Sequence, residues 1–242
     1  CSSDSRSLDD FAMPQPLSRV IPNGEFVADP NVLDDKPEFA KLVASIFAHA
    51  SYIERCQGLL LVRVLGADAA PAIAMFSTLT AQHLQLGALE AAAKAALTPH
   101  EFDVFATVTS TAERSQGDRH KLAHWIWGRC PQLKEEALLL ANPKTDKERD
   151  LALMQSLQNV DDEAFWTAET WSLDQTKPDS VLVYRRPDLE RVKCSIAQGA
   201  KIAHLLVVYL DDVFTGRRKP LPGSDPQQMR DLLFEMLCDV PP

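Results

Sequence analysis

The segment from residue 117 to residue 128, GDRHKLAHWIWG, contains the side chains of this chain that are best suited to chemistry. Arg119, His120, Lys121 and His124 lie within six consecutive positions. An imidazole gains and loses its proton near neutral pH, so it suits general acid or base catalysis. A guanidinium offers a fixed fork of donors for phosphate oxygens. The segment is therefore either the working surface of an enzyme or a helix end with ordinary solvated charges.

The histidine spacing also suits a metal ion. His120 and His124 are four residues apart, which places both imidazoles on one face of a predicted helix. A zinc site needs at least one further protein ligand, and the candidates by residue type alone are His49, His83, His100 and Glu113. A metal-binding helical bundle is thus the least favoured alternative, and we predict neither a metal nor another cofactor.

The same segment has a purely structural interpretation. Cationic side chains near a helix C-terminus favour the helix dipole, and Gly128 is a natural helix stop. Trp125 and Trp127 would then anchor a core or an interface. Under this interpretation the chain is a non-catalytic helical module that binds a protein partner.

Two helical segments precede this motif. Apolar residues at spacings of three and four predict a helix over residues 37–65, ending before Gly66. The Ala- and Leu-rich segment 68–97 predicts further helix, which Gly87 is expected to loosen or divide.

A third helix is predicted to begin at Thr98. Thr98 and Glu101 fit a capping box, and Pro99 occupies the first helical position, where its missing N–H costs nothing. The apolar pattern continues to about Trp127, with a kink or break expected near Gly117.

After the motif, the helical pattern gives way to short strand-like segments. ALLLA (137–141) and SVLVYR (180–185) read as two short strands that pair, with an insertion over about residues 142–179 between them. The insertion includes a helical fragment at 147–158, and RPDLE opens a fourth long helix that extends to Gly216.

This order of elements predicts a mainly α fold. We expect a four-helix-bundle-like core with a small β-hairpin-like element between the third and fourth long helices. Residues 1–36 lack a clear period and predict a flexible N-terminal arm, residues 37–216 form the helical domain, and residues 217–242 form a linker and a short C-terminal helix.

The composition of the chain disfavours several classes of protein. The 242 residues carry a net charge of −9, which disfavours broad nucleic-acid binding, so any such site must be local. No stretch of eighteen apolar residues predicts a membrane span. The five cysteines form no C-x-x-C pair, which favours reduced thiols and a cytoplasmic location. We expect Cys1 to mark a truncated chain rather than a lipoprotein, with Met13 as a candidate start.

Motifs of several common enzyme classes are absent from the sequence. It contains no GxGxxG, GxxxxGK[ST], GxSxG or HExxH. RHKLAH (119–124) instead resembles the R-x4-H motif of the HEPN superfamily of helical-bundle domains. The residue after the arginine, usually Asn in that family, is His120 here, and Ala123 precedes the histidine as it frequently does there. The resemblance extends to the order of the long helices over residues 37–216.

The resemblance implies an activity and partners. Catalytic members are metal-independent endoribonucleases that leave a 2′,3′-cyclic phosphate and a 5′-hydroxyl, and they often pair as homodimers. His124 would then move the proton, Arg119 would stabilise the phosphorane and His120 would assist, while Lys121, Trp125 and Trp127 would bind substrate. A toxin or defence role, with RNA, a second copy and a cognate antitoxin or other protein as partners, follows from the same resemblance.

Overall fold

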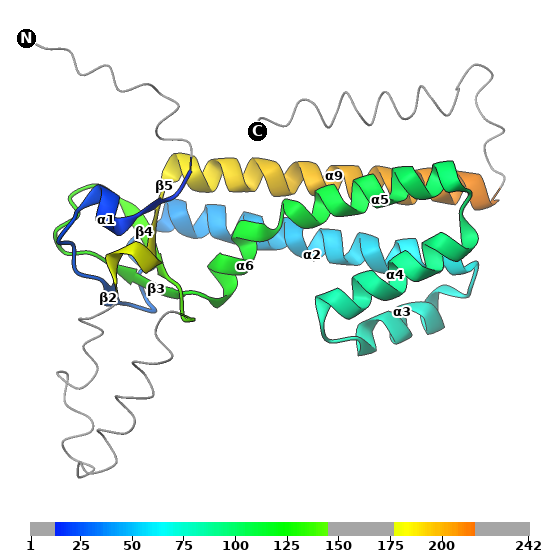
Figure 1. Cartoon of the computed structure of the whole chain (residues 1–242), viewed down its shortest axis with the longest axis horizontal. Helices are drawn as coiled ribbons and strands as arrows, with labels where there is room; N and C mark the ends of the chain where they lie inside the picture. The colour runs from blue at the N-terminus through cyan, green and yellow to red at the C-terminus, as the bar shows by residue number, and fades with distance from the viewer. Residues whose placement is uncertain (1–12, 145–176, 216–242) are drawn as a thin grey trace, which may run out of the picture. The chain divides into compact units, whose positions relative to one another are not determined.

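The computed structural model describes residues 13–144 and 177–215, and it is mainly helical with a small antiparallel sheet (Figure 1). The chain divides into two compact units. The sheet unit comprises Cys1–Ala44 and Asp118–Val192, and the helical unit comprises Ser45–Gly117 and Lys193–Pro242. Among the helices of the described ranges, none combines the length and the apolarity that a membrane span requires.

The sheet unit contains a five-stranded antiparallel sheet in the order β1-β5-β4-β3-β2. Its three longer strands follow one another along the chain and pair as neighbours: β3 (Ile126–Arg129), β4 (Ala137–Ala141) and β5 (Val181–Arg185). Two-residue strands lie at the edges, β1 (Gln15–Pro16) beside β5 and β2 (Val27–Ala28) beside β3. The central strand β4 is buried at every residue.

The predicted strands at 137–141 and 180–185 are confirmed, and they pair in register from Ala137 opposite Arg185 to Ala141 opposite Val181. The predicted hairpin-like element is nevertheless too small, because three further strands complete the sheet. An uninterrupted apolar run such as ALLLA is typical of a strand that is covered on both faces, and β4 has this environment.

The N-terminal residues differ from the predicted flexible arm. Within the described residues 13–36, β1, the short helix α1 (Leu17–Val20) and β2 belong to the sheet unit. Leu17 and Phe26 are buried in the apolar cluster of the sheet. Strands of two residues are too short to show the alternation from which a strand is predicted.

The helical unit includes most of α2 (Pro37–Leu65), all of α3 (Ala69–Thr78), α4 (Gln82–Ala96) and α5 (Pro99–Arg114), and most of α9 (Arg186–Thr215). Its buried cluster draws on all five helices, with members that include Leu60, Phe76, Leu89, Phe105 and Leu206. The bounds of α2 agree with the predicted helix over residues 37–65.

The start of α5 and the break between α3 and α4 can be compared with the sequence predictions. The predicted capping box is present, because the Glu101 amide donates to the Thr98 hydroxyl at 3.4 Å and the Thr98 amide donates to the Glu101 carboxylate at 2.8 Å. The segment 68–97 does form two helices, but the break lies at residues 79–81 rather than at Gly87. Gly87 is inside α4.

The third predicted helix ends earlier than expected. The sequence predicts helix to about Trp127, whereas α5 stops at Arg114, the short helix α6 (Gly117–His124) follows, and Trp127 belongs to β3. The prediction of a break near Gly117 is confirmed. Gly128 is a strand residue rather than a helix stop, since the β2 backbone lies against it.

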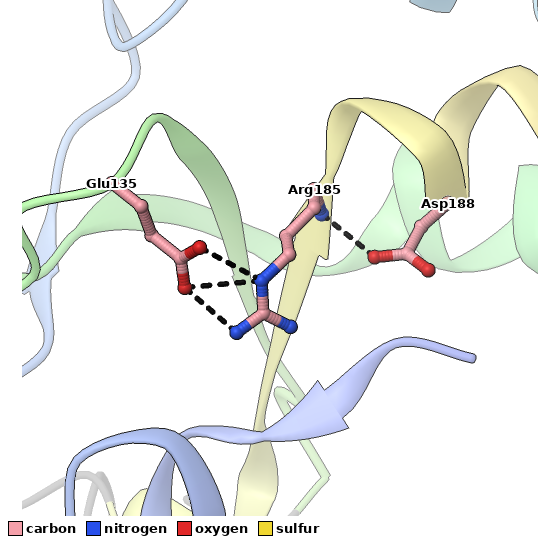
Figure 2. Close-up of polar contacts among 3 residues, drawn as sticks. All are labelled: Glu135, Arg185 and Asp188. Atoms are coloured by element: carbon pink, nitrogen blue, oxygen red, sulfur yellow. Dashed lines mark hydrogen bonds and ion pairs between the residues drawn. The ribbon is translucent and has the colours of Figure 1, made fainter. Parts of the chain in front are cut away.

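Strand β5 passes into α9 without a loop, and Figure 2 shows the side chains at this junction. Asp188, which is 2% exposed, accepts a hydrogen bond from the Arg185 backbone amide at 2.8 Å. This is the reach-back bond of a helix start, made from the third helical position. The Arg185 guanidinium binds both carboxylate oxygens of Glu135, with its shortest contact at 2.7 Å.

Gly128→Ala is expected to destabilise the sheet unit. An added Cβ would lie 2.3 Å from the Val27 carbonyl oxygen and 2.5 Å from the Phe26 ring, so β2 must move away from β3. We expect a loss of about 1–3 kcal/mol in the free energy of unfolding. Gly87→Ala is the matched control, because its Cβ meets nothing within 4 Å and a helix interior favours Ala over Gly by about 0.5–1 kcal/mol. Urea unfolding checks both, and an unaffected Gly128→Ala variant would contradict the described β2–β3 contact.

We expect the free energy of unfolding of Asp188→Asn to increase, relative to that of the natural chain, as the pH rises. Burial raises the pKa of Asp188 in the folded chain, against the opposing hydrogen bond from Arg185 and the charge of Arg191. The folded state therefore holds the proton more tightly than the unfolded state, so the natural chain loses stability as the pH rises through the carboxylate range. The carboxamide of the variant does not titrate, and its oxygen can still accept from the Arg185 amide. Urea unfolding of both proteins between about pH 3 and about pH 7 measures the difference in their free energies of unfolding. A difference that stays constant, or that increasingly favours the natural chain as the pH rises, would contradict this account.

Candidate functional site

Helix α6 carries the residues that the sequence singled out. It begins at Gly117, directly after the two-residue break that ends α5, and it ends at His124. Trp125 is the single residue between α6 and β3. The motif therefore lies on a short helix that leads into the sheet, rather than at the end of a long one.

A buried tyrosine fixes the first turn of α6. The Tyr184 hydroxyl donates to the Asp118 carboxylate at 2.9 Å, and Lys121 donates to the same oxygen at 2.8 Å. Tyr184 lies on β5 and is fully buried. Burial and the charge of Asp118 raise the pKa of Tyr184, so its hydroxyl stays protonated and remains a donor. The bond from Tyr184 attaches the first turn of α6 to β5, and Leu122 of the same helix is buried.

A tryptophan fixes the last turn. The Trp127 indole N–H donates to the Leu122 carbonyl at 2.8 Å, and the Trp125 amide donates to the Lys121 carbonyl at 2.9 Å. Both acceptors belong to the final turn of α6, whose carbonyls lack partners within the helix. Trp127 is itself held in β3, where it pairs with Leu140. The end of α6 is thereby attached to the sheet at a defined residue.

The two histidines of the motif contact each other. The rings of His120 and His124 have centroids 4.5 Å apart and are tilted by 52°. Both side chains are exposed. Partial burial lowers the pKa of His120, and the positive charges of His124, Arg119 and Lys144 lower it further. His120 is therefore biased toward its neutral form, which can accept a proton.

Arg119 is half-buried and acts on His120 through its charge. Arg119 and His124 are five residues apart, so on an ideal helix they diverge by about 140°. The structure thus brings the two histidines together, while Arg119 and His124 occupy different faces of α6.

Lys144 was missed by the sequence analysis. It lies in the turn after β4, where its amide donates to the Asn142 side chain at 3.0 Å, and its charge reaches His120. Ile126 pairs with Ala141, so the start of β3 and the end of β4 are neighbours and the turn follows close to α6. Only strand pairing brings this lysine to the motif, and residue spacing along the chain carries no signal for it.

The predicted substrate-binding residues have different surroundings. The Lys121 ammonium is bound to Asp118, and the Trp127 N–H is bound to the Leu122 carbonyl, so both have structural roles. Trp125 is half-buried beside the end of α6. In the described ranges, no group of three or more His, Cys, Asp or Glu side chains is arranged to hold a metal ion.

The side chains of this site could transfer protons to and from a bound anionic ligand. Two exposed imidazoles lie in contact, and Arg119 and Lys144 supply positive charge beside them. Comparison with known proteins found no matching family model and no similar curated protein or solved structure.

Tyr184→Phe tests whether β5 positions α6. The ring keeps its buried place, but Asp118 loses a charge-assisted hydrogen bond, at an expected cost of about 1.5–3 kcal/mol. The ring resonances of His120 and His124 are expected to shift in an NMR spectrum. Tyr52→Phe is the control, since the Tyr52 hydroxyl bonds His204 at an exposed surface. Stability and histidine resonances that respond no more to Tyr184→Phe than to Tyr52→Phe would refute the positioning role.

Proposed function

We propose that this chain binds RNA at the α6 surface and cleaves it without a metal ion, as a HEPN-like ribonuclease of toxin or defence type. The observation that carries the proposal is the contact between the exposed rings of His120 and His124, 4.5 Å apart, beside the charges of Arg119 and Lys144. Two imidazoles can supply the proton transfers of RNA transphosphorylation, and the neighbouring cations can stabilise its developing negative charge.

The reaction uses the neighbouring hydroxyl of the RNA as its nucleophile. The ribose 2′-oxygen attacks the adjacent phosphorus as its proton passes to His120, which is biased toward its neutral form, and the P–O5′ bond breaks. His124 in its protonated form donates to the departing 5′-oxygen. The products are a 2′,3′-cyclic phosphate and a 5′-hydroxyl, so atoms and charge balance without a metal or a cofactor.

Positive charge beside the histidines stabilises the developing phosphorane. Arg119 offers a planar fork of donors, and Lys144 adds a point charge from the turn after β4. Partial burial lowers the pKa of His120 first, and the charges of His124, Arg119 and Lys144 lower it further. Because the whole chain has a net charge of −9, this local group of cations is also where a polyanion would bind.

The resemblance of RHKLAH to the R-x4-H motif supports the same proposal, as does the mainly helical fold. Arg119 and His124 diverge on α6, so a homodimer with facing α6 helices would place Arg119 of one copy near His124 of the other. Trp125 is half-buried at the helix end, and it is the aromatic residue that we expect to stack on a base.

Purified full-length chain is expected to cut labelled single-stranded RNA in EDTA and to leave cyclic-phosphate ends. His124→Gln should reduce the rate about 10²–10⁴-fold, because it removes a proton-transfer group. Arg119→Lys should also reduce it, since the charge remains but the fork is lost. His83→Gln is the matched control, because His83 is an exposed histidine of α4 in the helical unit.

Two outcomes would reject the ribonuclease. One is the absence of cleavage across a varied RNA pool by folded protein. The other is cleavage that His124→Gln and His83→Gln reduce equally.

A further inference from the structure

We infer that His120 and His124 form a two-ligand chelate for a divalent transition-metal ion, and that a bound ion blocks proton transfer at this surface. The binding depends only on the geometry of α6. The blocking rests on the proposed function, because it concerns the reaction assigned to the same two imidazoles.

The spacing and the ring geometry both suit one shared ion. Residues four apart on a helix lie one above the other on the same face, so both imidazoles leave α6 in the same direction. With metal–nitrogen bonds of about 2 Å, two imidazoles on one ion have ring centroids about 4–5 Å apart. The observed separation of the two ring centroids is 4.5 Å, which lies within this range.

The helix that carries the pair is fixed at both ends. Tyr184 binds Asp118 in the first turn, and the Trp127 indole binds the Leu122 carbonyl in the last. The two imidazoles therefore start close to the binding geometry, which reduces the ordering that the ion must impose. Both rings are exposed, so the ion can approach and keep water molecules as its other ligands.

The ligand set selects the ion. Imidazole nitrogens suit Ni²⁺ and Cu²⁺, whereas Mg²⁺ and Ca²⁺ require oxygen ligands. In the described part of the chain no third His, Cys, Asp or Glu completes the group, so the site is an open chelate. The neighbouring charges of Arg119 and Lys144 oppose a cation and limit the affinity.

Chelation changes what the histidines can do. The lone pair that binds the ion is the lone pair that accepts a proton, so a chelated imidazole cannot act as the base and cannot form the imidazolium that serves as the acid. A transition-metal ion would therefore stop RNA cleavage at α6, and EDTA would restore it. Mg²⁺ would leave the same reaction unaffected, which separates chelation at the histidines from general effects of divalent ions on RNA.

Calorimetric titration of the full chain with Ni²⁺ tests the binding without reference to RNA. We expect one site whose affinity falls at least tenfold in His120→Gln and in His124→Gln, and no heat with Mg²⁺. His83→Gln and Cys194→Ser are the matched controls, because His83 is an exposed histidine of α4 and Cys194 is an exposed free thiol. Ni²⁺ affinity that is unchanged in both His120→Gln and His124→Gln would overturn the chelate.

The cleavage assay, repeated with Ni²⁺ and then with excess EDTA, tests the blocking separately. Cleavage that Ni²⁺ stops and EDTA restores supports it, and cleavage that continues with the site saturated overturns it. If no RNA is cut at all, the proposed function and the blocking fail together, while the calorimetric result still decides whether the chelate exists.

Discussion

The hydrogen bond from the Tyr184 hydroxyl to the Asp118 carboxylate is the constraint on which the candidate site depends. Tyr184 is fully buried on β5, where its hydroxyl would be costly to leave without an acceptor. Asp118 supplies that acceptor and also binds Lys121, so α6 is held to the sheet by its first turn. His120 and His124 remain exposed on the same helix, where they can meet a ligand.

The junction between β5 and α9 stabilises the strand that carries this tyrosine. Asp188 accepts from the Arg185 amide, and Glu135 binds the Arg185 guanidinium through both of its oxygens (Figure 2). Arg185 directly follows Tyr184, so these bonds also fix the place of Tyr184 in the strand. A surface that performs acid–base chemistry needs its groups held within a fraction of an ångström. The part-buried bond from Tyr184 to Asp118 fixes the helix itself, while its exposed side chains stay available.

Elements with strong local signals could be predicted from the sequence. The helix over residues 37–65, the capping box at Thr98 and the strand ALLLA were all confirmed, because periodicity and cap chemistry act within a few residues. The end of the third helix was not predictable in this way. Trp127 continues an apolar helical pattern, yet pairing with Leu140 places it in β3. Tertiary pairing overrode local preference there.

Some residues of the site could likewise be predicted from local sequence, whereas others depend on tertiary contacts. His120 and His124 could be selected from type and spacing, since four residues make one turn of helix. The structural roles of Lys121 and Trp127 depend on the placement of Asp118 and of the Leu122 carbonyl at the helix end. Lys144 approaches His120 through the pairing of β3 with β4, which no short motif encodes.

A single-turnover assay on a short RNA with one 2′-deoxy nucleotide tests the central claim most directly. If His120 and His124 catalyse transphosphorylation, the linkage after the deoxy sugar stays intact in EDTA. Neighbouring linkages then yield 2′,3′-cyclic phosphate and 5′-hydroxyl ends, which mass spectrometry distinguishes from hydrolysis products. Cleavage at the deoxy linkage, 5′-phosphate ends, or no cleavage of any linkage by the folded chain would contradict the account.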